Sequence, residues 1–243
     1  MSNGATLVSH KSTTLVSRDQ LRTIPQPVST ATFKPVPHIE LVETMEKVLN
    51  QRNINVQGEQ FAIRADGSRL FGTFDLSLNG VPDSCAALGF RQANDRSMAL
   101  QMVAGLRVFV CDNLCLNGDF VALERRHTSG LNLIEELTVA VDKFEEHYVT
   151  LKTEVANLKQ KELTDGEAKT IIHDIFVKDV LPVRLFPVVS KEYFNPRHSE
   201  FAPRTAWSLH NSFTEAVKSM PLTTRLVATS HVGREFGLVA KAV

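Results

Sequence analysis

The sequence of 243 residues has little of what marks secreted, membrane-bound or disulfide-stabilised proteins. Its three cysteines, Cys85, Cys111 and Cys115, form a sparse, odd set without a signal peptide, which is typical of a reducing compartment. No run approaches the roughly 18 continuous apolar residues of a membrane span, so we expect a soluble, cytoplasmic protein with no membrane partner. Basic and acidic residues both number 27, and this balance predicts no global attraction to nucleic acid or lipid.

Catalytic and metal-binding motifs are also missing. Cys111 and Cys115 lie close together and His127 follows, but the second pair of ligands that a structural zinc site needs is absent. The chain has no G-x-S-x-G motif and no glycine-rich phosphate loop. We therefore predict no metal, no cofactor, no small-molecule substrate and no catalytic residue. The enzyme hypothesis that remains would use Cys85, Cys111 or His127, or would pair Cys85 or Ser97 with His127.

The alternation of apolar and polar residues predicts an α+β fold with an N-terminal arm. Residues 1–37 contain four prolines, Pro25, Pro27, Pro35 and Pro37, which favour extended backbone, so we expect an irregular arm with one helical turn near residues 17–21. We expect residues 38–243 to form a single domain. Its parts are a first helix at about residues 38–52, a β-rich core at 54–126, a helical hairpin at 133–178, and a C-terminal helix and strand at 181–243.

About five or six short β-type runs make up the predicted core. Asp66-Gly67 divides the stretch 56–78 into two runs, and Asp-Gly is typical of a tight hairpin turn. Further runs cover 86–92, 98–104, 106–111 and 120–125, with Gly105 as a hinge and Asn117-Gly118-Asp119 as a turn. Short connections between successive strands predict an antiparallel β-meander rather than βαβ units.

The apolar period then changes to that of a helix. From Ile134 to Leu158 apolar residues recur alternately three and four positions apart, which predicts a long helix from Leu133 to about Leu163. The capping box at residues 164–167 begins a second helix at about 165–178, and we expect this helix to cover the far end of the first. Farther on we expect an extended stretch between Pro182 and Pro187, a helix at about 203–219 and a β-like run within 225–243.

Two polar clusters lack an evident structural role. The first joins two strands and is longer and more charged than a hairpin needs; it contains Arg91, Asn94, Asp95, Arg96 and Ser97. The second precedes the long helix and contains Asp112, Asn113, Asn117, Asp119, Arg125, Arg126 and His127. Turn formation explains the asparagines and aspartates of both clusters. The arginines, however, are suited to phosphate or to the carboxylates of a partner.

At these clusters the sequence resembles an uncharacterised family of phage- and plasmid-like proteins, number 932 of the domains of unknown function. The resemblance spans roughly residues 35–220 and is strongest at residues 108–119 and 126–128, with further matches at 94–97, 205–207 and 211–215. Where the family tends to have serine followed by histidine or tyrosine, this chain has Ala93-Asn94. The resemblance implies a gene of mobile elements, with no established enzymatic activity and no known cofactor.

Two functions follow as expectations. A meander that leads into a long helix is similar to the core of ring-forming single-strand annealing proteins of the Rad fifty-two type, which suggests a non-enzymatic, oligomerising protein of DNA recombination or replication. Single-stranded DNA would then contact Arg64, Arg69, Arg91, Arg96, Arg125 and Arg126. The alternative is a protein-interaction module that binds a host or element-encoded protein.

Overall fold

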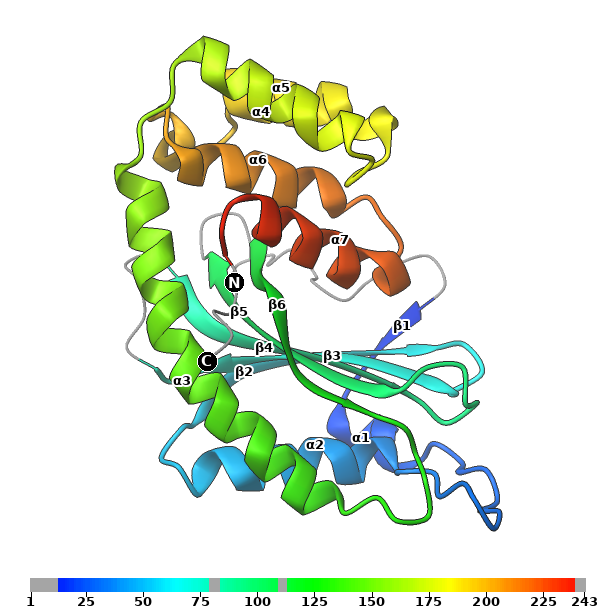
Figure 1. Ribbon diagram of the computed structural model, residues 1–243. Coiled ribbons are helices and arrows are strands. Elements are labelled where there is room, and N and C mark those ends of the chain that lie inside the picture. Colours follow the sequence, from blue (N-terminus) through cyan, green and yellow to red (C-terminus); the bar gives the residue numbers. More distant parts are fainter. Residues whose placement is uncertain (1–12, 79–83, 109–112, 239–243) are drawn as a thin grey trace.

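The computed structural model describes residues 13–78, 84–108 and 113–238 and confirms the α+β fold. Six antiparallel strands form one sheet in which each strand pairs with its neighbours in the sequence (Figure 1). The strands are β1 (Thr13–Val16), β2 (Val56–Arg64), β3 (Arg69–Leu76), β4 (Ser84–Ala93), β5 (Leu100–Val108) and β6 (Asn113–Arg125). The helices are α1 (Arg18–Arg22), α2 (His38–Asn50), α3 (Leu133–Gln160), α4 (Asp165–Val177), α5 (Phe186–Phe194), α6 (Ala206–Val217) and α7 (Leu222–Glu235).

The hairpin of β2 and β3 organises the core. Its turn passes through Gly67, whose φ of 71° lies in the left-handed region that the Asp-Gly pair predicts. One face of the sheet carries Phe61, Phe74 and Phe90, whose ring centroids lie 6.0, 6.2 and 5.2 Å apart in pairs. These rings form one continuous core with the apolar side chains of α2 and α3, which run along the same side of the sheet (Figure 1).

The last two strands differ from the prediction. Gly105 is not a hinge, because β5 is continuous and Gly105 pairs with Leu116 of β6. Nor does Asn117-Gly118-Asp119 separate two strands, because it lies inside β6. Between the pairs Val103–Val121 and Gly105–Leu116, β6 has more residues than β5, so the extra residues form a bulge. The turn-forming residues thus interrupt the pairing of a strand without ending it.

The long helix α3 buries the predicted apolar seam from Leu137 to Leu158, whereas Ile134 at its start is 43% exposed. Its neighbours are α2, β5, β6 and α6. Helix α4 begins at the predicted capping box but packs against α5, and α6 takes the place along α3 where we expected α4 (Figure 1). The connection after α3 explains this, because Leu163 N–H donates to Arg204 O (2.7 Å) and Ala206 N–H donates to Lys161 O (2.8 Å).

The described C-terminal part, residues 181–238, consists of helices joined by short irregular connections. The β-like run expected within 225–243 is helix α7, which begins after Pro221 and buries Ala228 and Val232, four residues apart, on one face. The stretch between Pro182 and Pro187 is not extended, because Pro187 lies in the first turn of α5, where proline is tolerated. None of the described helices is long and apolar enough to cross a membrane.

The N-terminal arm is more regular than expected. Thr13–Val16 adds strand β1 to the edge of the sheet, and a capping box between Ser17 and Gln20 begins α1, the predicted helical turn. Arg18 anchors this part through ion pairs with Glu46 and Glu59. The proline-rich remainder then reaches the two polar clusters, where Phe33 bridges Thr128 and Val36 contacts Asn94.

Candidate functional site

Asn94 of the first polar cluster holds the end of the arm. Its side-chain oxygen accepts a hydrogen bond from Val36 N–H (3.3 Å), and its amide nitrogen donates to Val36 O (2.9 Å). The buried amide thereby imitates a neighbouring strand and satisfies both backbone groups of Val36, which fixes the arm against the sheet.

Two further buried side chains complete this attachment. Gln92 donates to Val36 O (3.2 Å), and the same amide nitrogen lies 2.7 Å from His38 Nδ1. With this orientation of the Gln92 amide, His38 Nδ1 accepts, and Nε2 donates to Gly67 O (2.9 Å). Burial lowers the pKa of His38, which agrees with a neutral ring in this network.

A pocket of about 490 Å³ lies where the arm, the connection from β4 to β5 and the end of β6 meet. Both polar clusters therefore reach one site, and the arm provides its third wall. Lys34 N–H donates to His127 O (3.3 Å), and Phe33 forms an antiparallel bridge with Thr128. The pocket is lined by Thr32, Phe33, Ala93, Arg96, Ser97, Met98, Ala99, Glu124, Arg126, His127 and Thr128.

Three side chains of this pocket form a stack. The guanidinium carbon of Arg96 lies 4.5 Å from the centroid of the Phe33 ring. The Phe33 ring in turn lies nearly parallel to that of His127, with centroids 6.1 Å apart and an angle of 15°. Arg96 has a φ of 65°, which is uncommon for a residue other than glycine. Unfavourable backbone conformations of this kind are concentrated at functional sites.

Within the described parts of the chain, the positive charges of the pocket are not neutralised by ion pairs. Arg96 and Arg126 are exposed, and neither has a carboxylate within ion-pair distance among the described residues. Arg96 donates only a long hydrogen bond, to Thr30 Oγ1 (3.4 Å). Lys34, the next residue of the arm after Phe33, is also exposed and without an ion pair in the described part of the chain, but it lines a different pocket, between the arm and α2. Glu124 is the acidic residue of the lining, so the side chains around the pocket are positive in sum.

His127 is the buried polar group of the pocket. His127 is only 5% exposed, and within the described residues neither of its ring nitrogens has a hydrogen-bond partner. A buried polar group without a partner costs about 1–3 kcal/mol, so such a group requires an explanation. Burial, and secondarily the nearby His38, lower the pKa of His127 and keep its ring neutral near pH 7.

The other four predicted arginines have partners within the protein. At the hairpin, Arg69 Nε lies 3.1 Å from Asp95 Oδ2, and Arg64 Nη1 lies 3.9 Å from the same oxygen. Although burial alone would raise it, hydrogen bonds from Ser97 and the charge of Arg69 lower the pKa of Asp95. The remaining two are Arg91, half-buried with Nε 2.6 Å from Gln101 Oε1, and Arg125, whose Nε lies 2.7 Å from Glu136 Oε1.

Several predicted residues cannot be placed beside the pocket. Asp112, like Cys111, lies outside the described residues, and Asn113 and Asn117 are described in their backbone alone, as part of β6. Among the described residues, Cys85 is a buried free cysteine, and no group of three or more histidine, cysteine, aspartate or glutamate side chains is arranged to hold a metal ion.

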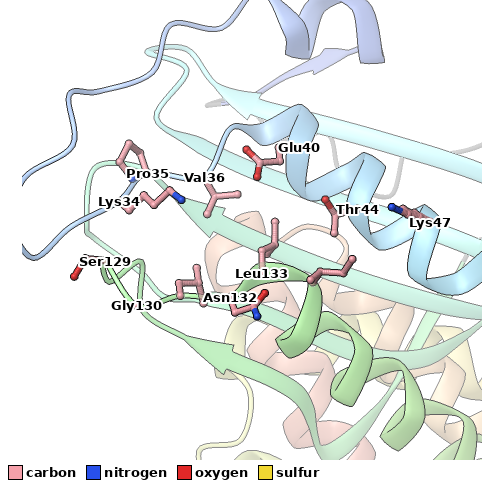
Figure 2. A pocket seen from close by; sticks show the side chains of 12 residues that line it. Lys34, Pro35, Val36, Glu40, Thr44, Lys47, Ser129, Gly130, Asn132 and Leu133 are labelled. Atoms are coloured by element: carbon pink, nitrogen blue, oxygen red, sulfur yellow. The ribbon is translucent and has the colours of Figure 1, made fainter.

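A second pocket, of about 460 Å³, lies between the arm, α2 and the start of α3. Figure 2 shows Lys34, Glu40 and Lys47 around it, with Asn132 at its α3 side. Asn132 already caps α3, because its side chain accepts from Glu135 N–H and donates to Glu135 Oε2 (3.0 Å). The mixed charges and the occupied cap make this pocket a weaker candidate than the one that contains Arg96.

Sequence reasoning missed Phe33 and Lys34, because a proline-rich arm gives no indication of where it docks. Phe33 is the sole aromatic residue within residues 1–37, and an isolated aromatic side chain in a polar, proline-rich segment is a signal that could have identified a docking point.

A model of the family described as Domain of unknown function (DUF932) matches residues 27–234 of the chain. The match begins within the arm and therefore includes every described residue of the Arg96 pocket. No curated protein and no solved structure gives a significant match.

Proposed function

The chain belongs to the DUF932 family, and we propose that it is a non-enzymatic protein of mobile-element DNA metabolism that binds single-stranded nucleic acid through phosphate at the Arg96 pocket. The observation that carries this proposal is the contrast among the six predicted arginines. Four have partners inside the protein, whereas Arg96 and Arg126, from separate polar clusters, line one pocket without a carboxylate partner among the described residues.

The chemistry of phosphate recognition fits this arrangement. A guanidinium donates two parallel hydrogen bonds to phosphate oxygens, and the pocket contains two guanidiniums, those of Arg96 and Arg126. The aromatic ring at the site, Phe33, is only 7% exposed, so it offers little surface on which a base could stack. Binding would therefore depend mainly on charge and little on base sequence.

The test is a titration of a labelled single-stranded oligonucleotide, followed by fluorescence anisotropy at several salt concentrations. We expect the dissociation constant to rise steeply with salt, because each neutralised phosphate releases counterions. Replacing Arg96 and Arg126 by alanine should weaken binding to every base sequence and reduce the salt slope by about 1 for each phosphate that the variant no longer neutralises.

Arg125→Ala is the matched control. It removes the same charge from the neighbouring position, but from a guanidinium that is paired with Glu136. We expect a much smaller loss of binding for this variant than for Arg126→Ala. Equal losses would refute the assignment of the pocket, and the absence of any binding at low salt would refute the function.

The protein-interaction alternative is supported by a separate surface. Where α4 ends and α5 begins, Val177, Val183, Phe186 and Val188 are 68%, 74%, 42% and 40% exposed. Clustered apolar exposure is typical of contacts between proteins, including copies of one chain. Val183→Asp should then lower the mass measured by light scattering without changing oligonucleotide affinity. A monomeric wild-type protein would refute self-association at this surface.

A further inference from the structure

The shape of the Arg96 pocket distinguishes it from an open groove. The arm, the connection after β4 and the end of β6 surround a volume of about 490 Å³, which is within the range of sites for small ligands. A continuous strand that only passes over the surface does not need a pocket of this kind. The end of a strand, or a single nucleotide, is small enough to enter it.

The polar groups of the pocket are matched to a doubly charged anion. Arg96 and Arg126, which have no carboxylate partner in the described parts of the chain, line one pocket that also has a threonine from each of two walls, Thr32 and Thr128. A phosphomonoester carries about 1.5 to 2 negative charges at pH 7 and has three terminal oxygens that accept hydrogen bonds. An internal phosphodiester has one charge and two such oxygens, so it would use less of the site.

The buried imidazole of His127 indicates a ligand in the pocket independently of the two arginines. It lines the pocket, is nineteen-twentieths buried, and has no hydrogen-bond partner at either ring nitrogen within the described residues. The Phe33 ring lies nearly parallel to the His127 ring, with centroids 6.1 Å apart, and the two unpartnered nitrogens at the edge of the imidazole are the groups that a ligand would hydrogen-bond. A neutral imidazole has one donor and one acceptor nitrogen, and a phosphomonoester can pair with either, because its monoanion has both an O–H donor and acceptor oxygens.

From these features we infer that the Arg96 pocket holds a phosphomonoester group, with Arg96 and Arg126 as its charge partners and His127 as its buried hydrogen-bonding partner. The inference rests on the proposed function, in which this group is the terminal phosphate of a nucleic-acid strand. The same chemistry would also accept the phosphate of a free mononucleotide.

The experiment compares single strands of one sequence that end in a 5′-phosphate, a 3′-phosphate or hydroxyl groups only, with the fluorophore at the opposite end. We expect one of the phosphorylated strands to bind about ten- to a hundredfold more tightly than the hydroxyl strand, as one or two added charge-assisted hydrogen bonds predict. His127→Gln should abolish this preference, so that the phosphorylated and hydroxyl strands bind with similar affinities. His173→Gln, at an exposed position of α4, is the matched control and should change neither quantity.

A mononucleotide and inorganic phosphate serve as competitors. If the mononucleotide displaces the phosphorylated strand at concentrations similar to the dissociation constant of that strand, this result supports the phosphomonoester site and identifies a free nucleotide as the ligand. Equal affinities of the three strands would overturn the inference but leave the proposed function standing. If no strand binds and neither competitor protects the wild-type protein from thermal unfolding, both are overturned. The comparison of strands needs no variant, so a misfolded His127→Gln protein would not prevent a decision.

Discussion

His210 should make the protein sensitive to acid. Its ring lies at 0% exposure in α6, stacked on Trp207 with centroids 5.5 Å apart and edge-to-face with Phe236 at 5.2 Å. Burial among these rings disfavours the charged imidazolium and lowers the pKa of His210 from 6.5 to about 3. The unfolded chain has no such restriction and binds a proton at the ordinary pKa.

The sign and size of the effect follow from this difference. Stability contributed by the neutral ring is fully present above pH 6.5 and is lost as the pH falls from 6.5 towards 3, because only the unfolded chain takes up the proton in that range. Between pH 7 and pH 4.5 the free energy of unfolding should fall by about 2–3 kcal/mol from this residue, at about 1.4 kcal/mol per pH unit.

Urea unfolding followed by circular dichroism, at pH 7 and pH 4.5, measures this loss. His38 and His127 also have lowered pKa values because of burial, so the wild-type loss contains their contributions. The loss in the free energy of unfolding between pH 7 and pH 4.5 is therefore measured for the wild type and for His210→Gln. The decisive quantity is the difference between these two losses. Equal losses for the two proteins would refute the reasoning, as would an NMR titration in which His210 is protonated near pH 6.

Two further predictions concern the sheet and the arm. Gly72→Ala should destabilise the protein by about 1–3 kcal/mol in urea unfolding, because the added Cβ would overlap the buried Phe90 ring on the paired strand; a change below about 0.5 kcal/mol would show that the ring moves freely. Asn94→Ala should loosen the arm, because Val36 loses the two hydrogen bonds that it makes with the Asn94 side chain, so that hydrogen exchange at Val36 N–H accelerates while exchange in α3 does not. Unchanged exchange at Val36 would show that Gln92 and β1 suffice to hold the arm.

Local sequence patterns predicted those elements whose formation depends on near neighbours. The Asp-Gly turn, the heptad seam of α3 and the capping box at Thr164 all act over a few residues, and the structure has each of them. The predictions failed where a local preference had two outcomes. Asn117-Gly118-Asp119 is compatible with a turn or a bulge, and only pairing with β5 selects the bulge. Likewise, α7 contains β-branched residues, but burial of Ala228 and Val232 against the core favours the helix.

The candidate site was predictable in part. The sequence by itself determined that Arg96, Arg126 and His127 belong to polar clusters with no evident structural role, because this can be seen from residue type and position. Only the tertiary structure decided that the clusters meet and that the arm completes the pocket with Phe33. It also decided which guanidiniums are already paired, as in the ion pair of Arg125 with Glu136. Interactions of this kind join residues far apart in the chain, and charge pairing depends on distances that no local pattern specifies.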